Sequence, residues 1–254
     1  MVRIFRLYLS CLLSLLIPIG LCAADNADHQ ARLSKHYRLE KPDGAGPFPS
    51  VMMVPGCSGF GADFQKKFYD SVQNQLVELG FVTLRVDYLA ARGLSSCAGT
   101  VSTDAVGDDI RIAASYLKQQ SFVKKATTNV MAWSYGGAGA LMALRRTNSQ
   151  EPAQVDAVVA YYPYCAGVRP WDSEVPVLVL VGAIDNVAPL GICESIFGAL
   201  PKRDKLTVRV YKDARHAFDN FQLPPEMQYA FGTLGYNEAA AKSAWKESTT
   251  FLRR

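Results

Sequence analysis

The chain has few of the residues that bind metal ions. Only three histidines occur among its 254 residues, and no two cysteines have the Cys-x-x-Cys spacing common in zinc sites. Zinc ions in proteins are held by compact sets of thiolate, imidazole and carboxylate ligands. We therefore expect no metal site, and the chemistry inferred below needs no other cofactor.

A marked excess of charge is also missing. The 27 basic and 23 acidic side chains give a formal charge of +4, and no run of basic residues exceeds three. Binding to nucleic acid or to an anionic membrane surface depends on a concentrated basic patch. The sequence therefore gives no electrostatic support for either function.

Repeats, low-complexity tracts and linkers are absent after the N-terminal segment, which contains the one long apolar run. Arg3 and Arg6 precede the apolar residues 7–21, and small residues follow before Asp25, which is the pattern of a signal peptide. The apolar run is short for a membrane span, which needs about 20 residues. We predict a signal peptide over residues 1–24; an anchor that is never cleaved is the alternative.

Residues 25–254 are predicted to form a single domain, because about 230 residues suffice for one large buried core. Without Arg3 and Arg6, the 25 basic and 23 acidic side chains leave a formal charge of +2. We expect the mature protein in the periplasm or secreted, with no stable membrane association. The sequence indicates no oligomeric state.

Four cysteines remain after the predicted signal peptide: Cys57, Cys97, Cys165 and Cys193. An even number of cysteines in an exported protein favours disulfide bonds. Three pairings are possible from the sequence, and four buried free thiols are the alternative.

Apolar runs that favour strands alternate with amphipathic patterns that favour helices. The runs near residues 50, 130, 157 and 178 are apolar on both faces, as in parallel strands covered by helices on each side. This alternation predicts an α/β fold with a mostly parallel central sheet and helices on both faces. Strands are predicted over Tyr37–Glu40, Ser50–Val54, Phe81–Asp87, Asn129–Trp133, Val155–Tyr162, Val175–Val181 and Leu206–Tyr211. Helices are predicted over 64–79, from Ser102 or Thr103 through Leu117, directly after Ser134, and over Asn237–Leu252.

The most informative segment is Val130–Gly137, in which an apolar run leads into Ser134 and two glycines follow one residue later. This is the pattern of a nucleophile elbow, a tight strand-to-helix turn that exposes a serine hydroxyl. Ala132 replaces the first glycine of the usual Gly-x-Ser-x-Gly pattern. Alanine is small, so the turn remains possible.

An acid and a base follow Ser134 in the chain. Asp185 comes directly after the predicted strand Val175–Val181, and His216 follows the predicted strand Leu206–Tyr211. The order serine, acid, histidine is that of the α/β-hydrolase fold, and open parallel sheets bind ligands at the carboxyl ends of their strands. We predict that Ser134 is the nucleophile, His216 the base and Asp185 the group that orients His216.

Each of these residues has a simpler interpretation when it is considered alone. Ser134 could cap a helix, Asp185 could be a turn residue, and His216 could be a hydrogen-bonded loop histidine. Asp213 and Asp219 flank His216 and compete with Asp185 for the role of the acid, although neither follows a separate strand. The joint occurrence in the right order favours the triad.

The glycine-rich turn after Ser50–Val54 is the candidate oxyanion hole. It reads Pro55-Gly56-Cys57-Ser58-Gly59, and a negatively charged intermediate needs preorganised donors such as backbone amides. We assign the amides of Cys57 and Tyr135, of which the second follows the nucleophile. Ser58 could move the donor by one position, and an ordinary strand-to-helix turn is the alternative.

These motifs together resemble the dienelactone hydrolase family of α/β hydrolases, and especially its exported members. The resemblance runs from about Tyr37 to Leu252, and it implies the α/β-hydrolase fold and ester hydrolysis. Its motifs are Pro-Phe-Pro before the first buried strand, Pro55–Gly59, Asp87-Tyr88 with Arg92-Gly93, Trp133–Gly137, Tyr162–Cys165, Gly182–Asp185 and His216–Asp219.

The chain also departs from the founding members of that family. They use a cysteine nucleophile where this chain has Ser134, and they carry a glutamate at the oxyanion strand that is absent here. They also carry an arginine shortly after the histidine, where this chain has Ala217–Asn220. These departures favour ordinary carboxylic esters over dienelactones. Arg92 could bind an anionic group at the site, and an ion pair with Asp87 is the alternative.

The family pattern implies the disulfide pairs Cys57–Cys97 and Cys165–Cys193, with all four cysteines at the carboxyl end of the sheet. Only about a dozen residues separate the strands that end at Tyr162 and begin at Val175, so we expect no large cap domain and an open site. Residues expected to contact the substrate are Phe60, Arg92, Tyr164 and Phe218, and further candidates for the walls are Tyr135, Tyr162 and Trp171.

The sequence therefore predicts a serine hydrolase that cleaves small to medium carboxylic esters through an acyl-enzyme. Its partner is a small-molecule ester. Acyl transfer or peptide cleavage by the same triad is one alternative. A non-catalytic α/β-hydrolase scaffold that serves for binding is the other.

Overall fold

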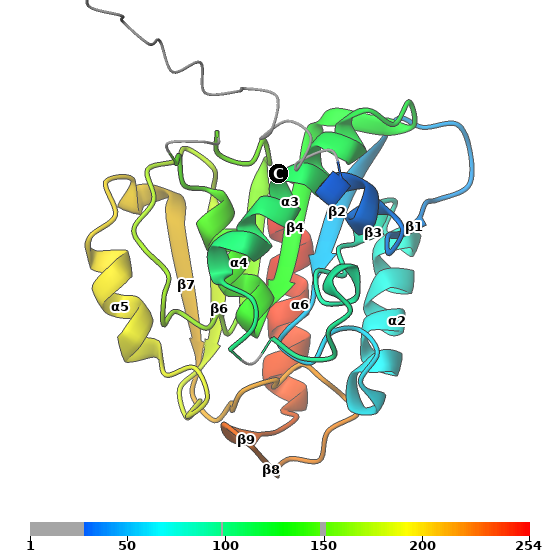
Figure 1. Ribbon diagram of the computed structural model, residues 1–254. Coiled ribbons are helices and arrows are strands. Elements are labelled where there is room, and N and C mark those ends of the chain that lie inside the picture. The colour runs from blue at the N-terminus through cyan, green and yellow to red at the C-terminus, as the bar shows by residue number, and fades with distance from the viewer. Residues whose placement is uncertain (1–27, 98, 148–150) are drawn as a thin grey trace, which may run out of the picture.

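A seven-stranded sheet forms the centre of the protein (Figure 1). The computed structural model describes residues 28–97, 99–147 and 151–254, so the predicted signal peptide lies outside the described residues. The strands are ordered β1-β3-β2-β4-β5-β6-β7, and all neighbours are parallel except β1, which is antiparallel to β3. They are β1 Arg38–Glu40, β2 Phe48–Val54, β3 Val82–Arg85, β4 Val123–Trp133, β5 Ala157–Tyr161, β6 Val177–Gly182 and β7 Leu206–Tyr211.

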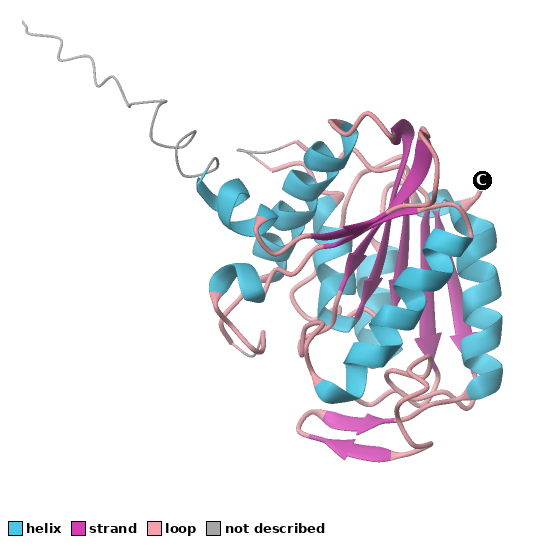
Figure 2. Ribbon diagram, turned by 90° about the vertical axis from the view of Figure 1, so that its right-hand side faces the viewer, coloured by secondary structure: helices cyan, strands magenta, loops and turns pink. Residues whose placement is uncertain are grey.

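Helices cover both faces of the sheet, as the view along it in Figure 2 shows. The residues of β2 alternate between two hydrophobic cores: Met52 and Val54 belong to one, and Val51 and Met53 to the other. Burial on both faces explains why such strands read as continuous apolar runs. The first core includes α3 Thr103–Lys118, α4 Ser134–Ala143 and α5 Leu190–Gly198, and the second includes α2 Asp63–Glu78 and α6 Glu238–Leu252.

Local sequence signals set the ends of several helices. The Ser102 hydroxyl accepts a hydrogen bond from the Ala105 amide at the start of α3, and the Asn237 side chain does the same for Ala240 at the start of α6. Gly80, with φ +92°, follows α2. These contacts satisfy backbone groups that a helix end leaves unpaired.

This architecture confirms the predicted α/β-hydrolase fold. The strand β7 has the predicted bounds, whereas β4 begins at Val123 rather than Asn129. The first part of β4 was not predicted because residues 124–126 are exposed and lack an apolar pattern. Residues 162–176, between β5 and β6, contain no helix or strand, so no cap domain is inserted there. Among the described residues, no helix has the length and apolarity needed to cross a membrane.

A second, two-stranded sheet was not predicted from the sequence. It is an antiparallel hairpin of β8 Met227–Tyr229 and β9 Gly232–Leu234. Figures 1 and 2 both place this hairpin just beyond the carboxyl ends of the central strands. It therefore lies at the edge of the sheet where the sequence places the site.

Candidate active site

Ser134 lies at a sharp turn between β4 and α4. The strand ends at Trp133 and the helix begins at Ser134, whose φ of +50° is in the left-handed region that non-glycine residues seldom adopt. Gly136 is required by close packing, because a Cβ there would lie 2.3 Å from the carbonyl oxygen of Pro55 and 2.6 Å from that of Val54. The turn thus holds Ser134 directly against the end of β2.

His216 lies between Ser134 and Asp185. Its Nε2 is 2.9 Å from the Ser134 Oγ, and its Nδ1 is 2.7 Å from the Asp185 Oδ2. The residues His216 and Asp185 are 5% and 6% exposed. A carboxylate at Nδ1 favours the tautomer with a proton on that atom, which leaves Nε2 free to accept the serine proton.

The other oxygen of Asp185 is held by the loop that follows it. Oδ1 accepts hydrogen bonds from the amides of Val187 at 2.9 Å and Ala188 at 2.8 Å. Gly182 at the end of β6 lets this loop approach the His216 loop, because a Cβ there would lie 2.1 Å from the carbonyl oxygen of Ala214. The carboxylate is therefore fixed on both sides.

The glycine-rich turn after β2 lies against the serine. A Cβ on Gly56 would come within 3.3 Å of the Ser134 Cβ and 4.0 Å of its Oγ. Two buried phenols hold this turn: the Tyr69 hydroxyl accepts from the Gly56 amide, and the Tyr88 hydroxyl donates to the Gly56 carbonyl, each at 3.1 Å. Both Gly56 and the next residue, Cys57, border the cavity next to Ser134.

The structure contains two disulfide bonds, Cys57–Cys97 and Cys165–Cys193. These are the pairs expected from the family resemblance. The first links the glycine-rich turn to the loop after β3, where the Cys97 amide also donates to the Cys57 carbonyl at 3.0 Å. The second links the loop after β5 to α5. Both brace loops at the carboxyl edge of the sheet.

A cavity of about 500 Å³ opens beside Ser134 and His216. This volume suits a small-molecule ligand. Of the residues expected to contact the substrate, Tyr164 lines it; of the further candidates, Tyr135 and Tyr162 do so and the buried Trp171 does not.

Three expected contact residues lie elsewhere, and the structure gives a reason for each. Phe60 is buried edge-on against the Tyr69 ring, and Phe218 is fully buried beneath the site, where it packs against the Tyr162 ring. Arg92 forms a bidentate ion pair with Asp109 at 2.5 and 3.1 Å. The ion-pair partner considered from the sequence was Asp87.

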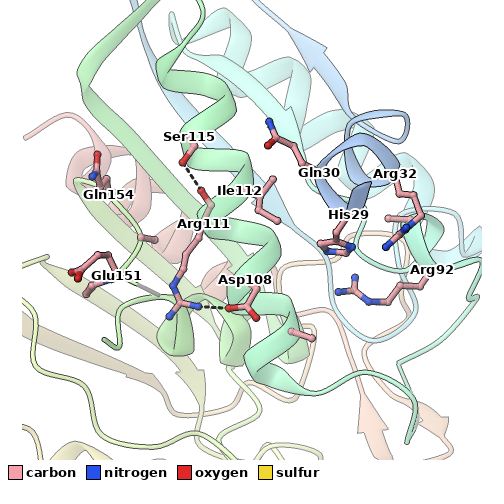
Figure 3. Close-up of a pocket in the computed structure, with 14 residues that line it drawn as sticks. His29, Gln30, Arg32, Arg92, Asp108, Arg111, Ile112, Ser115, Glu151 and Gln154 are labelled. Atoms are coloured by element: carbon pink, nitrogen blue, oxygen red, sulfur yellow. Dashed lines mark hydrogen bonds and ion pairs between the residues drawn. The ribbon is translucent and has the colours of Figure 1, made fainter. Parts of the chain in front are cut away.

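Arg92 lines a different cavity, of about 1000 Å³, which is shown in Figure 3. That cavity lies among α3, the helical residues 28–34 and the segment 151–154. Its charged groups are paired: Arg111 with Asp108, and both Arg92 and His29 with Asp109. It is separate from the cavity beside Ser134, with which it shares no lining residue.

Asp219, one of the two acids that flank His216 in the sequence, packs beneath the site. Its carboxylate accepts hydrogen bonds from the Trp133 Nε1 at 2.8 Å and the Tyr162 hydroxyl at 2.6 Å. The Tyr162 ring centroid lies 4.5 Å from that of His216. Burial raises the pKa of Asp219 to about 6 and raises that of the Tyr162 phenol well above its ordinary value. The phenol therefore stays neutral and donates.

The hairpin β8–β9 contributes residues to the cavity that were not predicted from the sequence. Tyr229, Phe231 and Leu234 all line the cavity. Leu234 forms a β-bridge with His216, and the Gly235 amide donates to the His216 carbonyl at 3.0 Å. Each strand has only three residues, too few for an alternating pattern to be read from the sequence.

Comparisons with known proteins agree with this geometry. The model of the dienelactone hydrolase family matches residues 36–254. A protein of Bradyrhizobium sp named "Probable 2-oxo-3-(5-oxofuran-2-ylidene)propanoate lactonase" is 23% identical over 232 residues, which are 85% of this chain and 87% of that protein.

Solved structures of esterases have the same fold. The dienelactone hydrolase-like promiscuous phosphotriesterase P91 from metagenomic libraries is 16% identical, with a TM-score of 0.63 over 85% of this chain and 98% of that one. The esterase Est2 of Thermogutta terrifontis with bound propionate is 14% identical, with a TM-score of 0.60 over 85% of this chain and 88% of that one.

Proposed function

Because the chain belongs to the dienelactone hydrolase family and is a hydrolase of ester bonds, we propose that it cleaves small to medium carboxylic esters with Ser134 as the nucleophile. The observation that carries this proposal is the continuous chain from Asp185 through His216 to Ser134, with distances of 2.7 and 2.9 Å. Such a chain at the carboxyl edge of a parallel sheet is the arrangement that activates a serine hydroxyl.

In the proposed reaction, Ser134 Oγ attacks the ester carbonyl carbon while its proton passes to Nε2 of His216. The carbonyl oxygen becomes negative, and the amides of Cys57 and Tyr135 stabilise it. When the intermediate collapses, the bond to the alcohol breaks and His216 returns the proton to the leaving oxygen. Water then attacks the acyl-enzyme in the same way and releases the acid. Asp185 orients the imidazole and stabilises the imidazolium in both halves.

We also propose that residues 1–24 are a signal peptide and that the mature domain acts in the periplasm or outside the cell. The two disulfides support an oxidising compartment, because such bonds rarely persist in a reducing cytosol. Both lie beside the loops that carry the site, so the compartment would affect the activity directly.

The test is labelling with a fluorophosphonate probe, which reacts with activated serines. The mature protein should be labelled at Ser134 and should hydrolyse p-nitrophenyl esters with short acyl chains, and Ser134→Ala should lose both properties while keeping its fold. A series of acyl chain lengths then measures the size of the acyl pocket. Absence of labelling would refute the proposal and favour a non-catalytic binding scaffold.

Two other activities of the same triad give distinct results in that assay. An acyltransferase would be labelled but would release product mainly when an acceptor alcohol is added. A peptidase would be labelled and would also cleave peptide or anilide bonds, which an esterase leaves intact. Residues 162–176, between β5 and β6, contain no cap domain, and such an open site favours small or medium esters over long-chain fats.

A further inference from the structure

The hairpin β8–β9 is attached to three of the loops around the proposed site: the acid loop, the oxyanion turn and the histidine loop. The Asn186 side chain, next to Asp185, accepts a hydrogen bond from the Thr233 amide at 2.8 Å. On the oxyanion side, the hydroxyls of Ser58 and Tyr229 are hydrogen-bonded at 3.1 Å. Together with the contacts of β9 to His216, these bonds hold the hairpin in one position relative to the nucleophile.

Gly232 allows this attachment. Its φ is +144°, and a Cβ there would lie 2.7 Å from the Asn186 Oδ1 and 2.9 Å from the Val187 side chain. A residue with a side chain would therefore push the hairpin away from the acid loop. The hairpin is thus built to pack against the site and is not a loose surface loop.

The hairpin presents aromatic rings to the cavity. Tyr229 packs against Phe64 at 6.3 Å between ring centroids and against Phe231 at 5.7 Å. Phe231 is 55% exposed, although it lines the cavity. A second aromatic pair, Tyr135 and Tyr164, is stacked at 6.1 Å and also lines the cavity. Planar rings in the substrate would find aromatic faces in this cavity.

The position of the hairpin indicates which part of the ester it contacts. In the proposed reaction the leaving alcohol receives its proton from Nε2 of His216, so the alcohol must lie beside His216. The strand β9 is bridged to His216 through Leu234. The hairpin therefore lies on the alcohol side of the scissile bond.

Among the described residues that line the cavity, no side chain could neutralise an anion by a fixed charge. No lysine, arginine, aspartate or glutamate is among the described residues that line it, and His216 is committed to Asp185 and Ser134. A carboxylate on the substrate would have to lose water without gaining a cation, which is costly. Arg92, the arginine that the sequence suggested for this role, lines the other cavity and is paired with Asp109.

We propose that the hairpin β8–β9 forms the alcohol-binding wall of the site, and that the substrates are uncharged esters of alcohols that carry an aromatic ring. The inference rests on the proposed esterase function. Tyr229 and Phe231 are its specificity-determining residues.

The test compares three acetates: benzyl acetate, hexyl acetate and 4-carboxybenzyl acetate. All three give the same acetyl-enzyme, so differences in kcat/KM arise in acylation, and the change of their ratio in the hairpin variants reports how the alcohol part is bound. An aromatic contact adds about 0.5–1.5 kcal/mol beyond the buried area, so benzyl acetate should exceed hexyl acetate by roughly 2- to 12-fold. The carboxylate of 4-carboxybenzyl acetate should lower kcat/KM by at least about 10-fold relative to benzyl acetate.

Variants of the hairpin locate the preference. Tyr229→Ala and Phe231→Ala should each reduce the ratio of benzyl to hexyl acetate toward one, and Tyr229→Phe should keep it, because the ring remains. Phe231 is exposed, so its variant keeps the fold even if Tyr229→Ala does not. Ile192→Ala, at an apolar position of α5 that is 43% exposed and outside the cavity lining, is the control and should keep the wild-type ratio.

Different failures have different meanings. If no acetate is hydrolysed and Ser134 is not labelled by the fluorophosphonate, the proposed function is wrong, and this inference with it. If Ser134 is labelled and all acetates are hydrolysed, but the ratio of benzyl to hexyl acetate is one or is unchanged by Phe231→Ala, only the inference is wrong. Equal turnover of benzyl and 4-carboxybenzyl acetate would also overturn it.

Discussion

The substitution Asp219→Asn should change how the stability of the fold depends on pH. The Asp219 carboxyl group has an ordinary pKa of 3.8, and burial raises it to about 6 in the folded protein. Between about pH 4 and pH 6 the group ionises in the unfolded chain but stays protonated in the folded one. The folded state then binds more protons than the unfolded state, so the free energy of unfolding falls as the pH rises.

The size of the effect follows from the same two values. A pKa difference between 3.8 and about 6 corresponds to about 3 kcal/mol, at about 1.36 kcal/mol for each pKa unit. Part of the residue surface remains exposed, so we take about 3 kcal/mol as the upper end and expect about 1–3 kcal/mol. Asparagine cannot ionise, so this contribution is absent from the variant.

The assay is urea unfolding of the mature protein, with its disulfides intact, at pH 4 and pH 7. The stability of Asp219→Asn relative to the wild type should rise by about 1–3 kcal/mol between these two pH values. The control is Asp213→Asn, at an exposed position on the same loop, which should show no such change. A difference between the wild type and Asp219→Asn that does not depend on pH would refute the reasoning.

Two further predictions concern the loops around the site. Cys97→Ser should lower the free energy of unfolding by about 4 kcal/mol, because its disulfide closes a 40-residue loop. It should also lower kcat, because the Cys57 turn is released. Thermal unfolding measures the first effect and ester kinetics the second, and an unchanged kcat would contradict the role of the turn. Gly136→Ala should destabilise the fold by about 1–3 kcal/mol and abolish activity, because the added Cβ would overlap the Pro55 carbonyl oxygen. Gly191→Ala, with open space around it in α5, should instead raise Tm slightly, and equal effects of the two changes would contradict the packing argument.

Much of the fold follows from the sequence because burial leaves a local signal. The strands β2, β5 and β6 and the C-terminal part of β4 are apolar on both faces. The positions of Ser134, Asp185 and His216 follow from the strands that precede them. Parallel strands end at the same edge, so no long-range information was needed to bring these residues together.

The rest of the site depends on contacts that the sequence does not encode locally. An aromatic residue looks the same in a sequence whether it lines a cavity or fills a core. The buried Phe60 and Phe218 could therefore not be distinguished from Tyr164, which lines the cavity. The partner of Arg92 proved to be Asp109, 17 residues away, rather than Asp87. The hairpin is held by Asn186 and His216, which are distant in the chain.

Three residues around the site, Ser134, Tyr162 and Ala217, have φ values of +50°, +37° and +59°. Ser134 and Tyr162 directly follow β4 and β5, and Ala217 lies in the loop after β7. Each left-handed residue other than glycine costs on the order of 1–3 kcal/mol. Glycine would relieve this strain, but at position 134 it would remove the nucleophile. Under selection for stability alone, substitutions should therefore accumulate at these strained positions of the site before they accumulate in the sheet. Relatives that have lost the activity are expected to carry glycine at these positions while keeping the core residues of β2 and β4.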